Sequence, residues 1–180
     1  MRDLRFGQEM VLIAAPSMKI AFDGNWRHVL QWFRNQGIRS IYDVSYGADI
    51  CTWAHLRYIE QHPDAKLISQ PCAAVVNYVL KHKQELLPHL SPIQSPMLCL
   101  AIYIRKVLGY NGKIAAISPC IAKGDEFLDT GMIDYNVTME HLRDYFNKNG
   151  IDLPTVKLYS EFEFDDNIGG LYIDGLELTK

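Results

Sequence analysis

Short, continuous apolar runs alternate along this chain with stretches in which apolar residues recur at every third or fourth position. The continuous runs predict buried strands, at residues 10–15, 38–44, 66–69, 113–117 and 134–137. The periodic stretches predict helices, near residues 23–37 and at residues 48–61, 72–83, 95–108 and 138–149. Strands that alternate with helices predict an α/β fold with short, mostly parallel sheets flanked by helices.

Local start and stop signals support several of these boundaries. Ser95 followed by Pro96 is typical of a helix start, because serine can cap the helix and proline at the first position loses no hydrogen bond. Thr138 is a second predicted cap, and Gly37 is a helix stop. The length is that of a single domain over residues 1–180, in which the acidic, glycine-rich residues 161–180 are expected to pack loosely.

Two of the predicted strands are followed by the same dipeptide. The run at 66–69 leads to Pro71 and Cys72, the run at 113–117 leads to Pro119 and Cys120, and a helical pattern follows each cysteine. Ligands bind at the carboxyl ends of the strands in open α/β sheets. A thiol at the start of a helix has a lowered pKa and binds metals or reacts more readily. The repeated corner is therefore the strongest indication of function in the sequence.

Composition narrows the classes of function. The net charge of −3 gives no basic surface for nucleic acid, and no apolar run is long enough to cross a membrane. The first residues lack the apolar core of a secretion signal, so we expect a cytoplasmic protein. In that reducing compartment its four cysteines are expected to be thiols or metal ligands rather than disulfides.

Most of the polar and sulfur-containing residues allow two interpretations. Cys72 and Cys120 are either metal ligands at paired corners or two small buried residues. Cys51 and Cys99 lie within apolar helical patterns and are predicted to pack in the core. Lys123 and Glu126 could flank a ligand held by Cys120, as an anion-binding cation and a proton-relaying carboxylate, or could be a solvated helix start.

Several colinear motifs resemble the C-terminal domain of [FeFe]-hydrogenases, which carries the H-cluster. Residues 72–79 (C-A-A-V-V-N-Y-V) correspond to the family's first loop, usually T-S-C-C-P-x-W-V. Residues 119–126 (P-C-I-A-K-G-D-E) correspond to its second loop, usually M-P-C-x-x-K-x-x-E. Residues 85–96 match the segment between these loops, and residues 15–17 match the end of the family's first strand.

The resemblance implies roles for these positions. Cys72 and Cys120 would be two of four thiolate ligands of a [4Fe-4S] cluster, which would stand beside a di-iron subcluster. Lys123 would hydrogen-bond a cyanide of the di-iron unit, and Glu126 and Ser95 would lie on a proton route from solvent. The pocket of the di-iron unit would be lined by Ala15, Pro16 and Ser17. A redox partner such as a ferredoxin is also implied.

The chain departs from the family pattern at functional positions. Pro71 stands where the first loop normally has a proton-shuttling cysteine, and no cysteine follows Cys120 to provide the two thiolates of a third loop. Val75 replaces the first loop's tryptophan, and Ser118 replaces the second loop's methionine. We therefore expect a divergent redox or H2-sensing relative, with its cluster completed by residues outside this chain. The alternatives are a fragment of a hydrogenase-type enzyme and a truncated, inactive product.

Overall fold

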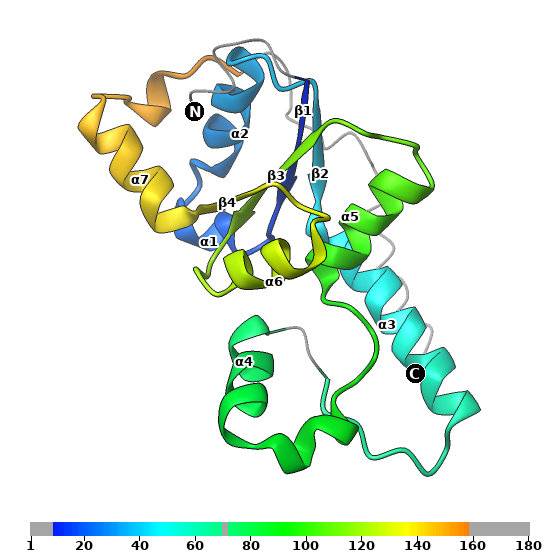
Figure 1. Ribbon diagram of the computed structural model, residues 1–180. Helices are drawn as coiled ribbons and strands as arrows, with labels where there is room; N and C mark the ends of the chain where they lie inside the picture. The colour runs from blue at the N-terminus through cyan, green and yellow to red at the C-terminus, as the bar shows by residue number, and fades with distance from the viewer. Residues whose placement is uncertain (1–8, 70–71, 159–180) are drawn as a thin grey trace.

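A four-stranded, fully parallel sheet forms the centre of the protein, in a computed structural model that describes residues 9–69 and 72–158. Its strands are β1 (Met10–Ala14), β2 (Ser40–Asp43), β3 (Lys113–Ser118) and β4 (Tyr135–Thr138). They lie in the order β2-β1-β3-β4 (Figure 1). The predicted α/β fold with parallel strands is confirmed, whereas the predicted loose packing of residues 161–180 concerns a segment outside the described residues.

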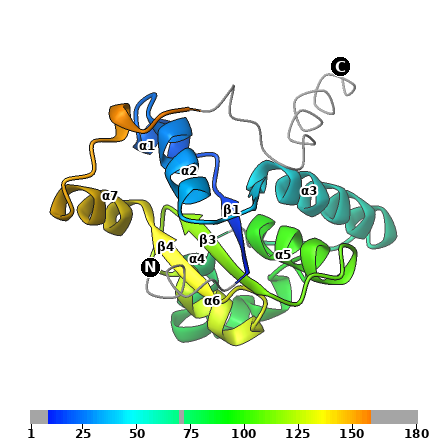
Figure 2. The ribbon, with the colours of Figure 1, turned by 90° about the horizontal axis from the view of Figure 1, so that it is seen from above.

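Helices cover both faces of the sheet. They are α1 (Met18–Ala21), α2 (Trp26–Asn35), α3 (Val44–Gln61), α4 (Ala73–His82), α5 (Pro96–Lys106), α6 (Lys123–Thr130) and α7 (Met139–Lys148), with the 3₁₀ turns η2 (Gln84–His89) and η3 (Leu153–Thr155). Figure 2 shows α1, α2 and α7 on one face, and α5 and α6 on the other. Within the described ranges, no helix combines the length and the apolar character that crossing a membrane requires.

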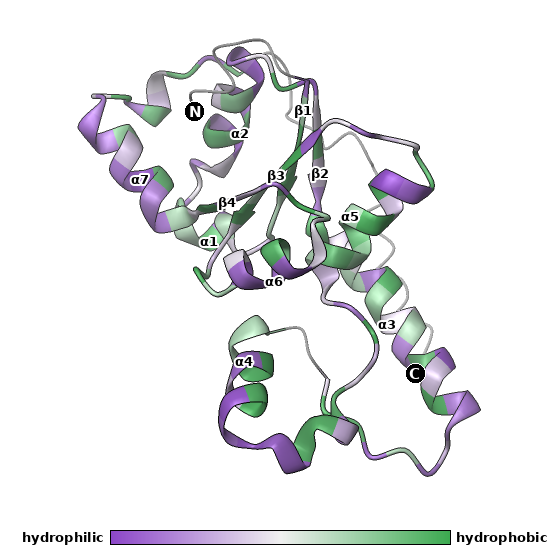
Figure 3. Ribbon diagram, viewed as in Figure 1, coloured by the Kyte–Doolittle hydropathy of each residue, from purple (hydrophilic) through white to green (hydrophobic). Residues whose placement is uncertain are grey.

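The core lies on both faces of β1 and β3, and their side chains are almost completely buried. This two-sided burial explains why both strands are continuous apolar runs rather than alternating ones. On one face, Trp32 of α2 makes edge contacts with Tyr145 and Phe146 of α7. On the other face, α5 packs extensively against α3, and the hydrophobic residues concentrate on the strands and on α5 (Figure 3).

Capping contacts decide where several helices begin. The Asp43 carboxylate accepts a hydrogen bond from Ser45 N at 2.8 Å, so α3 begins directly after β2 and four residues earlier than its sequence pattern predicted. Thr138 caps α7 as predicted, because its hydroxyl accepts from His141 N at 3.2 Å. Helix α5 begins at Pro96 as predicted, but the Ser95 side chain makes no capping hydrogen bond.

The strand predicted at residues 66–69 is wrong. Ile68 forms an isolated parallel bridge with Leu90, with hydrogen bonds from Ile68 N to His89 O and from Ser91 N to Ile68 O. Leu67 and Ile68 are only half-buried, and the segment lies outside the central sheet. A short apolar run cannot reveal whether a neighbouring strand is available to pair with it, so only one of the two Pro-Cys corners follows a strand of the sheet.

A charge cluster connects β3 to the start of β4. The Asp134 carboxylate accepts hydrogen bonds from Lys113 Nζ at 2.7 Å, Ile114 N at 2.9 Å and an Arg105 guanidinium nitrogen at 3.0 Å. Burial by itself raises the pKa of Asp134, but these hydrogen bonds and the two positive charges outweigh burial, and the pKa lies below its ordinary value. The ionised carboxylate therefore stabilises the register of β3 and β4.

Candidate functional site

The strand order creates a switch point at the carboxyl ends of β1 and β3. The chain passes from β1 to β2 on one side, and then crosses to β3 on the other side of β1. Ligands in open α/β sheets bind outside such a point. Ala15 follows β1 and donates its backbone N–H to Ile117 O of β3 at 3.0 Å, which places the segment of residues 15–17 beside the corner that carries Cys120. The fold thus brings the residues that the resemblance assigned to the di-iron pocket next to Cys120, which it assigned to the adjacent [4Fe-4S] cluster.

Residues 15–17 differ in how they face this edge. Ala15 is buried, Pro16 is exposed, and Ser17 is half-buried with its hydroxyl 3.9 Å from Met139 Sδ. The contact of these residues with a di-iron unit stays a prediction.

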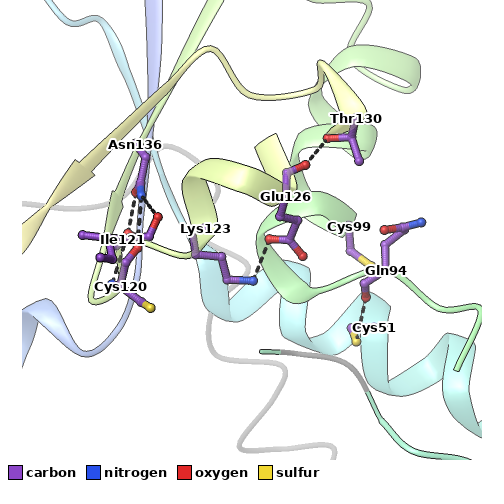
Figure 4. A network of polar contacts seen from close by, with 10 residues as sticks. Cys51, Gln94, Cys99, Cys120, Ile121, Lys123, Glu126, Thr130 and Asn136 are labelled. Carbon is purple, nitrogen blue, oxygen red and sulfur yellow. Dashed lines mark hydrogen bonds and ion pairs between the residues drawn. The ribbon is translucent and has the colours of Figure 1, made fainter. Parts of the chain in front are cut away.

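A serine–asparagine network holds the Cys120 corner. The Ser118 hydroxyl is completely buried and lies 2.5 Å from Asn136 Oδ1 and 3.0 Å from Cys120 O. Asn136 Nδ2 donates to Cys120 O at 3.0 Å and lies 3.4 Å from Ile121 O (Figure 4). These contacts fix the backbone of Cys120 and leave its half-buried thiol outside the network. Asn136 was missed by the sequence analysis, since no local signal connects β4 to a corner sixteen residues earlier.

Lys123 and Glu126 form a buried ion pair on the first turn of α6. Lys123 Nζ lies 2.7 Å from Glu126 Oε2, and the two side chains are 11% and 14% exposed. The alternative of a solvated helix start is therefore wrong. The pair is covered because α6 packs beside β4 and α4. Figure 4 shows both side chains directed toward one another, between Cys120 and the buried thiols of Cys51 and Cys99.

A small cavity next to this pair contains the Ser95 hydroxyl. The cavity has a volume of about 150 Å³, and its lining includes Gln94, Ser95, Glu126 and residues of α4. Ser95 is only 1% exposed, and its Oγ has no hydrogen-bond partner among the described protein groups. The structure thus places Ser95 and Glu126 on one cavity, as a shared proton route requires. The transfer of protons between them stays a prediction.

Cys72 is at the N-cap of α4 and is exposed, so it is not a core residue. Helix α4 contacts α6, and Asn77 Nδ2 donates to Asp125 Oδ2 at 2.9 Å. The two helices that follow Cys72 and Cys120 in sequence therefore contact one another. Pro71, at the predicted shuttle position, lies outside the described residues.

The four cysteines of the chain fall into two groups. Cys51 and Cys99 are buried as predicted, each with its thiol near Gln94 O, and burial is the main cause that raises the pKa of both. They are poor thiolate ligands. Cys72 and Cys120 can supply two ligands, which is half of what a cubane cluster usually requires. Among residues 9–69 and 72–158, no three His, Cys, Asp or Glu side chains are grouped as a metal site.

Comparison with known proteins identifies related sequences and structures. Residues 8–173 match the family described as the iron only hydrogenase large subunit, C-terminal domain. None of the curated proteins matches the chain significantly.

Solved [FeFe]-hydrogenase structures share the fold. An apo [FeFe]-hydrogenase variant from Chlamydomonas reinhardtii has a TM-score of 0.74 at 20% identity, over 90% of this chain and 47% of that one. A structure concerning stepwise H-cluster assembly has a TM-score of 0.71 at 21% identity, over 90% and 46%. A third, on oxygen inactivation that begins at the H cluster 2Fe subcluster, has a TM-score of 0.69 at 20% identity, over 90% and 48%. The chain spans about half the length of these solved structures.

Proposed function

Because the chain belongs to the family of the iron only hydrogenase large subunit, C-terminal domain, we propose that Cys72 and Cys120 provide two thiolates for a [4Fe-4S] cluster. The other ligands come from residues outside this chain. One observation carries the proposal: Cys120 follows β3 at the switch point of the sheet, three residues before a buried cation. In this proposal the bound cluster supplies one-electron transfer.

The residues around the two cysteines have separate tasks in this proposal. The Ser118–Asn136 network holds the Cys120 backbone, so that its thiolate is presented at the edge of the sheet. Lys123, three residues after Cys120 on the first turn of α6, would supply the positive charge that stabilises an anionic ligand, and Glu126 orients its ammonium group through the 2.7 Å ion pair. Residues 15–17 lie at the same edge of the sheet, where they would line the pocket of a di-iron unit.

A redox or H2-sensing role is favoured over rapid turnover. In the family pattern the position before the first-loop ligand carries a proton-shuttling thiol, and proline has no titratable group. A chain with Pro71 can hold a cluster and change its redox state, but it lacks the usual path for fast proton delivery. The exposed thiol of Cys72 favours a reducing compartment such as the cytoplasm, with a ferredoxin-type protein as electron partner.

A hydrogenase-type enzyme is the second candidate, and one observation favours it. Ser95 and Glu126 line the same cavity beside the Lys123 ion pair, which is the arrangement that a proton path would need. Infrared bands of diatomic iron ligands and H2 turnover after maturation would establish this candidate. Their absence, together with an EPR signal from a reduced cluster, would leave the redox or sensing role.

Anaerobic reconstitution tests the ligand assignment. Iron and sulfide content and the EPR spectrum of the reduced protein would be measured for the wild type, Cys72→Ser and Cys120→Ser, with Cys99→Ser as a matched control. We expect each of the first two variants to lose most of the bound iron, and the control to retain it. If both ligand variants bind as much iron as the wild type, the assignment is wrong.

A further inference from the structure

Two thiols from distant parts of the chain converge on one carbonyl oxygen. Cys51 Sγ of α3 lies 3.3 Å from Gln94 O, and Cys99 Sγ of α5 lies 3.4 Å from the same atom. The two thiols are also close enough that each affects the pKa of the other. Figure 4 shows Cys51, Cys99 and Gln94 gathered beside Glu126.

A close approach of the two helices explains this proximity. Gly47 of α3 packs against α5 so tightly that a Cβ atom there would lie 2.1 Å from Pro96 O and 2.8 Å from Leu100 Cβ. Cys51 is four residues after Gly47 and therefore lies on the same face of α3, one turn further along. Cys99 precedes Leu100 directly. The glycine thus allows the backbone spacing at which the two cysteines meet.

Both thiols are buried, and one of them lies at the wall of a surface groove. Cys51 is 7% exposed and Cys99 is 8% exposed. Cys99 also lines an apolar groove of about 450 Å³ between α3 and α5, whose other walls include Tyr46, Trp53 and Ile102. A small, uncharged oxidant can enter such a groove and reach Cys99, and Cys51 lies beside Cys99 on the same carbonyl oxygen.

The two thiols differ as nucleophiles. Burial, together with the neighbouring Cys51 and Glu126, raises the pKa of Cys99 to about 12. Burial also raises the pKa of Cys51, but the neighbouring Cys99 thiol and the positive charge of Lys123 act in the opposite direction. Cys51 is therefore the better attacking thiol, and Cys99 is placed to resolve its oxidised form.

We propose that Cys51 and Cys99 form a redox dithiol, which peroxides oxidise to an intramolecular disulfide that covalently joins α3 to α5. The Cys51 thiolate attacks one peroxide oxygen, the O–O bond breaks, and the other oxygen leaves as water after taking a proton. The Cys99 sulfur then attacks the Cys51 sulfenic acid, the S–S bond forms, and the hydroxyl leaves as water. The Cys99 thiol supplies the proton for this second water. In total, two electrons pass from the thiols to the peroxide, and hydrogen peroxide is reduced to two water molecules.

The dithiol is separate from the proposed cluster, because it uses neither Cys72 nor Cys120. It nevertheless adjoins the candidate site, since Gln94 lines the same cavity as Ser95 and Glu126. Closing the disulfide removes both S–H donors from the Gln94 carbonyl. Oxidation therefore changes the hydrogen bonding of the residue next to Ser95.

Thiol counting and peptide mapping test the proposal on metal-free protein. In the Cys72→Ser/Cys120→Ser double variant, Cys51 and Cys99 are the only remaining cysteines. Hydrogen peroxide should remove both thiols together, and non-reducing digestion should give one cross-linked peptide pair from monomeric protein, which dithiothreitol separates. Adding Cys51→Ser to this background should abolish the cross-link. Peptide mapping of the peroxide-treated wild type should show the same Cys51–Cys99 cross-link in a protein that keeps Cys72 and Cys120.

Three results would overturn the proposal. These are survival of both thiols in peroxide, accumulation of sulfinic acid on one cysteine without a cross-link, and wild-type disulfides that join Cys51 or Cys99 to Cys72 or Cys120 instead. None of these results bears on iron binding, so failure of the dithiol proposal is distinct from failure of the cluster proposal.

Discussion

The contact between α3 and α5 at Gly47 yields a prediction with a clear magnitude. Replacing Gly47 by alanine puts a methyl group 2.1 Å from a backbone carbonyl oxygen, more than 1 Å inside ordinary contact distance. A backbone atom cannot turn aside as a flexible side chain can, so the two helices must separate. Overpacking of this kind costs about 1–3 kcal/mol, which outweighs the gain of roughly 1 kcal/mol from alanine's higher helix propensity.

We expect Gly47→Ala to lower the free energy of unfolding by a net amount of about 1 kcal/mol, measured by urea denaturation followed by circular dichroism. The matched control is Gly124→Ala in α6, where the nearest atom to the new methyl group would be Asn136 Nδ2 at 3.9 Å. The control should leave stability unchanged or raise it by roughly 0.5 kcal/mol. Equal stability of the two variants would refute the argument from close approach, as would unhindered peroxide cross-linking of the dithiol in Gly47→Ala.

Three further predictions concern buried polar groups, each checked by urea unfolding. Lys123→Met should lower the free energy of unfolding by about 3 kcal/mol, because it leaves the Glu126 carboxylate unpaired in a mostly buried position. The double variant Lys123→Met/Glu126→Gln should lose less stability than Lys123→Met, because it removes the unpaired charge; losses that simply add would contradict this explanation. Asp134→Asn should cost about 2 kcal/mol at pH 7. The folded pKa of Asp134 is depressed, so this contribution is complete above the unfolded pKa of about 3.9 and is lost as pH falls through the lower, folded pKa. A cost that does not depend on pH in the acid range would refute this reasoning. Ser118→Ala should lower the free energy of unfolding by about 1–2 kcal/mol, because it removes the contact with Asn136. Ser95→Ala should change it by less than about 0.5 kcal/mol, because the Ser95 hydroxyl has no partner among the described protein groups. A larger effect of Ser95→Ala than of Ser118→Ala would contradict the structure.

Local sequence patterns predicted most elements where a single segment carries the whole signal. The strands β1 and β3 are buried on both faces and therefore read as continuous apolar runs. The threonine cap of α7 was also predicted, because its donor and acceptor lie three residues apart. The run at residues 66–69 has the same local character as β1, yet it forms only an isolated bridge. Whether an apolar run becomes a strand depends on a neighbour that local pattern does not identify.

In the candidate site, too, some residues could be identified from local sequence and others only from their neighbours in the folded structure. Cys72 and Cys120 were found from a repeated dipeptide, which is a feature of the sequence itself. The burial of the Lys123–Glu126 pair could not be predicted, because two charges three residues apart at a helix start have the same pattern whether they face solvent or a packed neighbour.

By itself, the sequence determined the α/β character, the family and the two candidate thiolate ligands, because each depends on residue types at short separations along the chain. Only the tertiary structure decided the strand order β2-β1-β3-β4, which brings residues 15–17 to the Cys120 corner. It also decided that Cys51 of α3 and Cys99 of α5 share one carbonyl oxygen. The physical reason is that strand pairing and helix packing bury apolar surface from distant segments together, and the polar groups carried along acquire neighbours that no local pattern specifies.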